Sequence, residues 1–177
     1  MSDEQLMERV KQGDLAKATV LFERYNKHLY NFFVKISFDQ DLGHDLTQNV
    51  FLRMLKFKHT YKTGAKFKSW IFQIARNIYA DHYRSNKVAK SREVLNLQQQ
   101  DEAIDVQWAN SEREKLLYIA MYRLNVDQRE LLLMSKFQKM KYEDIAQVYE
   151  TSVGAIKVKV HRAIKKLQEN YFKLEKI

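Results

Sequence analysis

The chain of 177 residues has no cysteine and no proline, and it has only four glycines. Without cysteine it can form no disulfide framework, no thiolate zinc site and no thiol nucleophile, which fits a reducing cytoplasm. β-Sandwiches and β-barrels depend on proline and glycine in their turns, so the scarcity of both favours an all-helical fold. Long hydrophobic runs are also missing, since the longest notable one covers only residues 131–134. With the acidic, polar start MSDEQLMERVKQGD, this predicts no signal peptide and no membrane insertion.

Acidic side chains are nearly absent from one stretch of the sequence. Residues 53–92 carry eleven basic side chains and one acidic side chain, whereas residues 93–114 carry one basic and six acidic side chains. Residues 115–177 are basic again, with thirteen basic and seven acidic side chains. Two basic blocks separated by an acidic stretch indicate two modules that each bind a polyanion. Nucleic acid is the favoured polyanion, and an anionic membrane surface is the main alternative.

Apolar residues recur at every third or fourth position, which predicts helices over about 14–37, 41–58 and 67–84. Gly64 permits a turn between the second and third helices. The periodicity is lost over residues 85–112 and then returns in helices that begin near residue 116 and cover about 127–138, 142–149 and 152–171. We therefore expect an all-α protein with an N-terminal helical bundle (1–85), a linker (86–112) and a C-terminal helix-turn-helix domain (113–177).

The strongest local pattern is YEDIAQVYETSVGAIKVKVHRAIKKLQ, at residues 142–168. It predicts a short helix, a tight turn and a second helix for which Ser152 is a favourable N-cap, which together make a helix-turn-helix motif. Residues 155–166 include five cations and no acid. Such a helix fits the DNA major groove, with its first turns at base edges and its lysines at phosphates. The alternative, a plain helical hairpin with a basic solvent face, explains the apolar spacing but not the one-sided charge.

Aromatic rings alternate with cations between residues 56 and 84. Rings that stack on unpaired bases, at roughly 1–3 kcal/mol per base, and cations that follow the backbone are typical of single-strand binding. The alternative is that the rings form the core, which the apolar stripe favours for Phe57, Phe67, Trp70 and Phe72. Tyr61 lies in a polar loop, and we expect it to be exposed and to contact a base.

Three segments resemble, in order and spacing, those of bacterial RNA polymerase sigma factors. The segment GHDLTQNVFLRMLKF (43–57) resembles the helix that binds polymerase. KFKSWIFQIARNIYADHYRSNK (66–87) resembles the segment that melts and reads the −10 element, and residues 124–168 resemble the domain that reads the −35 element. The resemblance covers about residues 10–85 and 112–172. It leaves no room for the additional domains of housekeeping sigma factors, so the similarity is to the compact extracytoplasmic-function (ECF) subfamily.

This resemblance implies a transcription initiation factor and not an enzyme. It implies binding to core RNA polymerase and to promoter DNA, recognition of −35 and −10 elements, and stabilisation of the melted −10 strand. An anti-sigma factor is a further expected partner, and no cofactor or metal is implied. The expected location is the cytoplasm.

The resemblance also implies three sets of contact residues. The polymerase set is Asp45, Gln48, Asn49, Phe51 and Arg53. The −10 set, in which the loop 61–67 captures a flipped base of the non-template strand, is Tyr61, Lys62, Thr63, Lys66, Phe67, Trp70, Arg76, Asn77 and Arg84. The −35 set is Ser152, Lys157, Val158, Lys159, His161 and Arg162.

The chain departs from the family pattern within these regions. Asn49 replaces a usual glutamate, so one charged contact to polymerase is missing or comes from a neighbour. Glu150 replaces a usual turn glycine, at a cost of about 1 kcal/mol if its backbone is left-handed. Lys157 and Lys159 stand where arginine is frequent, and lysine cannot bind guanine as a two-pronged donor. We therefore expect −35 recognition to depend largely on phosphate contacts and DNA shape; these residues encode neither the promoter sequence nor the anti-sigma partner.

Two other functions explain less of the sequence. An enzyme is disfavoured because HExxH, GxxxxGK[ST] and GxSxG motifs are absent and the five histidines lack ligand spacing. A self-contained helix-turn-helix repressor would need a dimer with two half-sites, and it would leave residues 43–84 without a role.

The linker is long enough for both reading modules to bind one promoter. As a flexible coil, residues 85–112 span roughly 30 Å, similar to the ~34 Å of one DNA turn. Its acidic residues Asp101, Glu102 and Asp105 are expected to keep it off DNA and to suit a basic path in polymerase.

Overall fold

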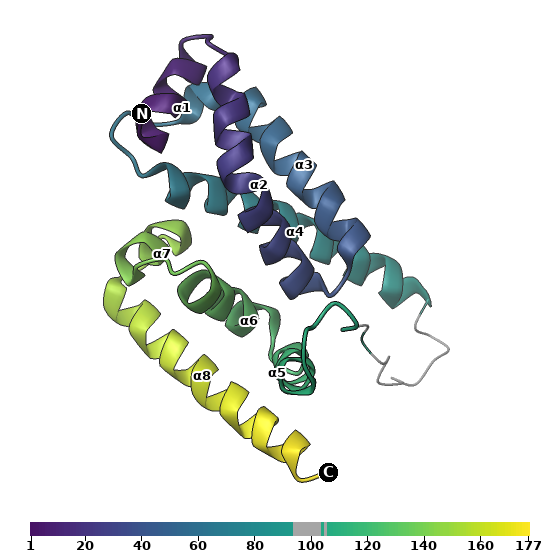
Figure 1. The fold of residues 1–177 in the computed structure, drawn as a ribbon. Coiled ribbons are helices and arrows are strands. Elements are labelled where there is room, and N and C mark those ends of the chain that lie inside the picture. The colour runs from purple at the N-terminus through teal and green to yellow at the C-terminus, as the bar shows by residue number, and fades with distance from the viewer. Residues whose placement is uncertain (94–103, 105) are drawn as a thin grey trace.

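The computed structural model describes residues 1–93, 104 and 106–177, and every regular element in these ranges is helical (Figure 1). The N-terminal module contains α1 (Asp3–Lys11), α2 (Ala16–Ser37), α3 (Gln40–Lys56), the 3₁₀ turn η1 (Lys58–Thr60) and α4 (Phe67–Glu93). The C-terminal module contains α5 (Glu112–Tyr122), α6 (Val126–Leu132), the π turn η2 (Leu133–Phe137), α7 (Tyr142–Tyr149) and α8 (Val153–Glu175). The expected all-α fold with two helical regions is confirmed.

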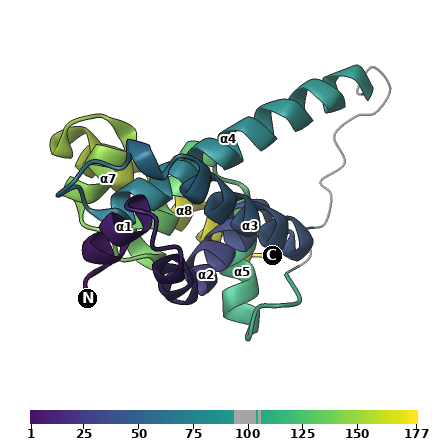
Figure 2. The same cartoon turned by 90° about the horizontal axis from the view of Figure 1, so that it is seen from above.

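Two helical segments differ from the expectation. The N-terminal helix α1 was not predicted; it is nucleated by a capping box, in which Ser2 accepts from the Gln5 amide and the Gln5 side chain accepts from the Ser2 amide. Helix α4 continues to Glu93, through the first part of the predicted linker. Figure 2 shows this end of α4 projecting away from the other helices. Among the described residues it has no neighbouring helix to pack against, so the sequence there lacks an apolar period although the chain is still helical. The acidic residues 101, 102 and 105 lie outside the described residues.

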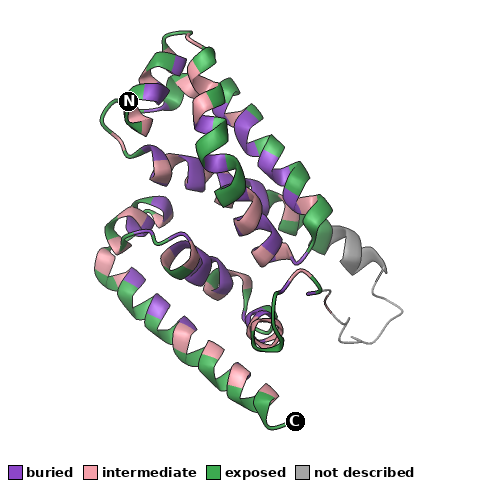
Figure 3. Ribbon diagram, in the orientation of Figure 1, coloured by how far each residue is buried: buried purple, intermediate pink, exposed green. Residues whose placement is uncertain are grey.

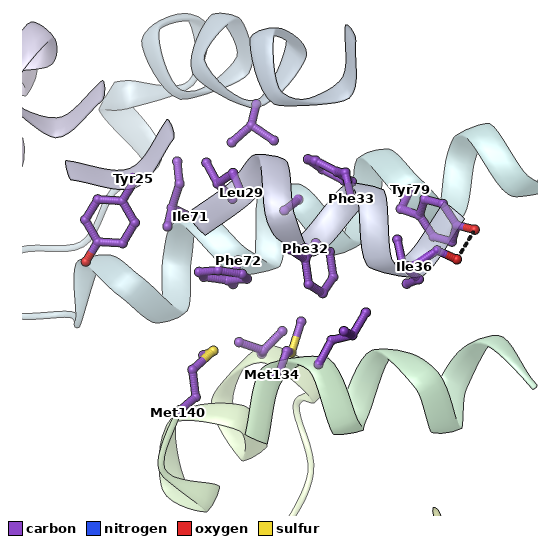
Figure 4. Close-up of a cluster of buried hydrophobic side chains, with 14 of the residues drawn as sticks. Tyr25, Leu29, Phe32, Phe33, Ile36, Ile71, Phe72, Tyr79, Met134 and Met140 are labelled. Carbon is purple, nitrogen blue, oxygen red and sulfur yellow. Dashed lines mark hydrogen bonds between the residues drawn. The ribbon is translucent and has the colours of Figure 1, made fainter. Parts of the chain in front are cut away.

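The core of the N-terminal module lies between α2 and α4. Leu29 and Phe32 of α2 and Ile71 and Phe72 of α4 are fully buried, and the Phe32 and Phe72 rings meet edge to face at 5.5 Å. Figure 4 shows these side chains interleaved along the two helices. Burying a side chain of this size contributes roughly 1.5–3 kcal/mol, so this cluster holds the module together.

The same apolar cluster continues into the C-terminal module. Met134 of η2 and Met140, which follows it, face Phe32 and Phe72 across the boundary (Figure 4). Helix α7 packs against α4, and η2 packs against α2. The two modules therefore lie against each other, an arrangement that the sequence did not predict.

A buried cation also joins the two modules. The Arg129 guanidinium on α6 is only 7% exposed and donates to four main-chain carbonyls, those of Ile36, Met121, Tyr122 and Leu124. The bond to Ile36, at 2.7 Å, reaches the last turn of α2, where carbonyls lack helical partners and the helix dipole is negative. Burial lowers the pKa of Arg129 from its ordinary value. The four carbonyl oxygens stabilise the positive charge of the guanidinium. Arg129 thus fixes α6 to the end of α2.

The helix-turn-helix geometry has the predicted form. Ser152 caps α8, because its hydroxyl accepts from the Ala155 amide at 3.1 Å. Ala146 is buried where α7 meets α8, and its small side chain permits a close crossing. Glu150 has φ 52° and ψ 47°, so it occupies the left-handed conformation that glycine adopts at lowest cost.

None of the described helices has both the length and the apolar character that a membrane crossing requires.

Replacing Glu150 with glycine should stabilise the protein. The left-handed backbone at this position costs a non-glycine residue about 1 kcal/mol, so Glu150→Gly should raise the free energy of unfolding by about that amount. Urea denaturation measures the change. The matched control is Gln147→Gly, at an exposed position inside α7, which should lower it by about 1 kcal/mol. A neutral or destabilising Glu150→Gly would contradict the backbone assignment.

Replacing Arg129 should destabilise the contact between the modules. Arg129→Met removes four hydrogen bonds, among them those to the Tyr122 and Leu124 carbonyls, and should lower the free energy of unfolding by about 2 kcal/mol. It should also enlarge the radius of gyration measured by small-angle X-ray scattering. Arg123→Met, which removes an exposed cation from the turn between α5 and α6, is the control and should change neither quantity. Equal behaviour of the two variants would rule out the role given to Arg129.

Candidate nucleic-acid interface

Five of the six members of the −35 set lie on the exposed face of α8, and Figure 3 shows the exposed stretches along this helix in green. The opposite face is buried against the rest of the C-terminal module through Ile156, Val160 and Ala163. This periodicity turns five members of the set to solvent: Lys157, Val158, Lys159, His161 and Arg162. Across the described residues, no carboxylate forms an ion pair with the three cations among them. The sixth member, Ser152, lies at the start of the helix as its cap.

The polymerase set divides between surface and interior. Asp45, Gln48 and Asn49 are exposed on the outer face of α3. Phe51 is buried instead, with its ring 4.8 Å from that of Phe22 on α2, so its side chain packs in the core, and its expected part in polymerase binding stays a prediction. Leu52, which is not in the predicted set, is 65% exposed and lies one helical turn after Gln48.

Arg53, the remaining member of the polymerase set, points toward α4. Its guanidinium lies 3.5 Å from the Asp81 carboxylate, and Arg84 of the −10 set approaches the same carboxylate at 2.7 Å. Asp81 therefore connects the two sets. All three side chains remain solvent-accessible, so each single contact contributes little, typically below about 1 kcal/mol.

Tyr61 corrects a central expectation for the −10 set. Its side chain is 1% exposed, its ring lies 5.2 Å from that of Trp70, and its hydroxyl donates to the Ala65 carbonyl. The polar neighbours suggested exposure, but the ring turns inward and closes the loop 61–67 from inside. The exposed residues of this loop are Lys62, Thr63, Gly64 and Lys66.

Of the four rings for which the core alternative was favoured, all but one are buried or half-buried. Phe67 and Phe72 are fully buried, which excludes direct base stacking by either in this arrangement. Trp70 is half-buried and keeps part of its indole accessible. Phe57 is 42% exposed, so the expectation that it belongs to the core is wrong. It follows α3 and lies beside the 3₁₀ turn, beyond the helical period used to place it.

A cleft of about 250 Å³ lies beside the exposed part of the loop. Its walls include Lys62 and Lys66 from the loop, Ser69 and Trp70 from α4, and Gln147 from α7. The Ser69 hydroxyl is buried and has no hydrogen-bond partner among the described residues. The cleft is smaller than the roughly 300–1,000 Å³ of pockets for drug-sized ligands. It offers the accessible part of the Trp70 ring, while the Ser69 hydroxyl is buried beside it. Sequence reasoning missed Ser69, although it directly precedes Trp70.

Two cations of the −10 set pair with acids of the C-terminal module. Arg76 Nε lies 2.5 Å from Glu130 Oε1, and its guanidinium lies over the Tyr149 ring at 4.1 Å. Tyr149 donates its hydroxyl to the same Glu130 oxygen. Lys66 Nζ lies 2.7 Å from the Asp144 carboxylate. These pairs join residues far apart in the chain, so no local pattern predicts them.

The acid beside Arg76 is almost completely buried, with 4% of its side chain exposed. Burial raises the pKa of the Glu130 carboxyl, while the bonds from Tyr149 and Arg76 act in the opposite direction. Burial alone would lower the pKa of Arg76, but the Glu130 charge raises it on balance. The Arg76–Glu130 pair therefore forms only when α4 of one module lies against α6 of the other.

Asn77, the last member of the −10 set, is exposed on α4.

Comparison with known proteins places both modules. Residues 21–88 match the family described as Sigma-70 region 2, and residues 116–167 match Sigma-70, region 4. The chain is 30% identical over 136 residues to ECF RNA polymerase sigma factor EcfG of Rhodopseudomonas palustris (strain TIE-1), covering 77% of this chain and 75% of that one. It is 28% identical over 176 residues to RNA polymerase sigma factor CarQ of Myxococcus xanthus, covering 96% and 97%.

A solved structure shares the fold. The sigma factor RpoE in complex with the anti-sigma factor NepR from Bartonella quintana superposes with a TM-score of 0.71 at 24% identity, covering 86% of this chain and 94% of that one. The matched regions, the order of the modules and the fold agree. The chain therefore belongs to the extracytoplasmic-function family of RNA polymerase sigma factors, which confer promoter-specific initiation of transcription.

Proposed function

We propose that this protein carries core RNA polymerase to its promoters, reads the −35 element with α8, and holds the melted −10 strand with the loop 61–67 and α4. The observation that carries the proposal is the exposed basic face of α8, where Lys157, Lys159 and Arg162 have no acidic partner among the described residues. The polymerase would dock on the outer face of α3, where Asp45 and Gln48 lie beside the exposed Leu52.

Recognition of the −35 element would rest on the second helix of the helix-turn-helix motif. Lys157, Lys159 and Arg162 are positioned to neutralise phosphates on both sides of a major groove. Val158 is 49% exposed between them, and an aliphatic side chain in this place suits contact with a thymine methyl group. The binding energy would come mainly from phosphates, which makes it strongly dependent on salt.

Recognition of the −10 element would use the cleft beside the loop. Extruding a base from the duplex costs a few kcal/mol, and stacking on an aromatic ring returns roughly 1–3 kcal/mol. Trp70 supplies the ring. The Ser69 hydroxyl is buried in the packed arrangement and would supply a hydrogen bond to a base edge only once opening exposes it. Lys62 at the edge of the cleft and Thr63, exposed on the loop, suit contacts with the DNA backbone. Tyr61, being buried, would act by supporting the loop and not by stacking.

Binding both elements would require the modules to separate. In the packed arrangement Lys66 and Arg76 pair with Asp144 and Glu130, and α7 forms one wall of the cleft. The −10 side chains are thus engaged by the module that would read the −35 element. We infer that the packed arrangement is the form without promoter, and that docking on polymerase opens it. An anti-sigma factor, as in the complex of the relative RpoE, would be a partner that acts on this equilibrium.

The proposed −35 contacts can be tested by removing charge from α8. The triple variant Lys157→Ala, Lys159→Ala, Arg162→Ala should abolish run-off transcription from promoters selected with core polymerase on a genomic fragment library. The slope of log affinity against log salt should become shallower by about 0.9 for each phosphate that the variant no longer neutralises. The control removes three exposed lysines elsewhere (Lys139, Lys173 and Lys176) and should leave start-site choice unchanged. Unchanged start-site choice in the first variant would refute the proposal.

The proposed polymerase contact can be tested on α3. The double variant Gln48→Ala, Leu52→Ala removes two neighbouring exposed side chains and should weaken binding to core polymerase at least ten-fold, or about 1.4 kcal/mol. Fluorescence anisotropy with labelled protein measures the affinity. The control is Gln168→Ala, Phe172→Ala, which removes an exposed pair of the same spacing from α8. If only the control weakens binding, the docking surface lies elsewhere.

A further inference from the structure

Helix α1 contacts the main chain of the loop 61–67 at both ends. Lys11 Nζ donates to the Tyr61 carbonyl at 2.8 Å, where the loop begins. The Glu4 carboxylate accepts from the Phe67 amide at 3.2 Å, where the loop ends and α4 starts. Between these two contacts lie residues 62–66, which include the exposed part of the loop.

The Glu4 contact supplies a cap that the local sequence lacks. The first amides of a helix have no partner within the helix, and a side-chain oxygen from the preceding residue usually accepts from them. Lys66 precedes α4 and has no side-chain acceptor. Glu4 accepts instead, and its negative charge suits the positive end of the α4 dipole. The start of α4 is thus fixed by a residue 63 positions earlier in the chain.

Tyr61 completes the connection from inside the loop. Its ring packs against Phe67 and Trp70, and its hydroxyl donates across the loop to the Ala65 carbonyl. Burial raises the pKa of Tyr61 to about 12, and further contributions come from the carboxylates of α1, which are those of Glu4, Glu8 and Asp3. The hydroxyl therefore stays protonated and remains a donor near neutral pH.

A purely structural role for α1 accounts for only one of its faces. Leu6, Met7 and Val10 are buried in the core of the N-terminal module, as expected for any amphipathic helix. That burial does not require Lys11 and Glu4 to reach the two ends of one loop. A pair of polar contacts at both ends of a reading loop fixes its shape, and hydrogen bonds to a base lose strength steeply when the geometry shifts.

We propose that α1 is a clamp on the loop 61–67, and that Lys11 and Glu4 are positioning residues for selection of the −10 sequence. The inference rests on the proposed function of that loop. Neither residue contacts the promoter; each sets the shape of the loop and the start of α4, which together form the cleft of Ser69 and Trp70.

The test compares base selectivity at −10 and −35 positions in the full-length protein with core polymerase. Lys11→Met should reduce the preference for the best base at one −10 position at least five-fold, measured by run-off transcription on promoters substituted one position at a time. The loss of transcription caused by each −35 substitution, and the affinity for core polymerase, should stay within two-fold of the values for the unmodified protein. Lys11→Arg keeps a donor at this position and should retain the preference.

The matched control lies in the same helix. Arg9 is exposed, and its side chain forms no ion pair among the described residues, so Arg9→Met removes the same charge without removing a bond to the loop. It should leave selectivity unchanged, which separates the clamp from a general loss of positive charge. Glu4→Met tests the other end of the loop and provides an independent variant if Lys11→Met fails to fold.

Two results would overturn the clamp. One is unchanged −10 selectivity in both Lys11→Met and Glu4→Met; the other is an equal loss at −10 and −35 positions. A Ser69→Ala, Thr63→Ala variant separates this failure from failure of the proposed function. If that variant alters −10 selectivity and the α1 variants do not, only the clamp is wrong. If it has no effect either, the loop does not read the −10 element.

Discussion

The arrangement of this protein depends on a guanidinium buried between two helical modules. An isolated charge in an apolar interior is strongly unfavourable, and Arg129 is tolerated because four carbonyls surround it. One of those carbonyls belongs to α2, and the other three belong to the end of α5 and the turn after it. The site is therefore complete only when both modules are in contact. The Arg76–Glu130 pair, the Lys66–Asp144 pair and the wall that α7 gives to the cleft all require the same contact.

The interface uses side chains that suit two kinds of partner. Lys66 and Arg76 bind carboxylates here, and phosphates present the same kind of acceptor. The Lys66 side chain is 53% exposed, so exchanging the Asp144 carboxylate, which is 14% exposed, for a phosphate costs the lysine little. Glu130 is different, because it is buried and would lose its cation if the modules parted. Separation must therefore let water reach Glu130, so the energetic barrier to opening lies at this carboxylate more than at the lysine.

The sequence predicted the elements whose causes are local. The period of α8 and the cap at Ser152 placed the basic face correctly. Leu52 could also have been predicted to be exposed, because it lies four residues after the exposed Gln48 on the same helix. The errors have distant causes. Tyr61 has polar neighbours in the sequence, but its ring is buried. The main chain at Tyr61 contacts Lys11 of α1, which lies 50 residues earlier. Helix α1 has only three buried apolar side chains, too few for its period to stand out, and the pairs across the interface join residues at least 54 positions apart.

The length of α4 has a consequence for how the second module finds its site. Its 27 residues form one continuous helix of about 40 Å, which begins at the loop 61–67 and whose C-terminal end projects from the other helices. A stiff segment covers distance without the loss of chain entropy that a coil would incur over the same span. Once the modules part, the rod carries the chain over more than the ~34 Å of a DNA turn before residue 94. A shorter tether then confines the tethered helix-turn-helix to a smaller volume, which raises its effective concentration at the upstream element.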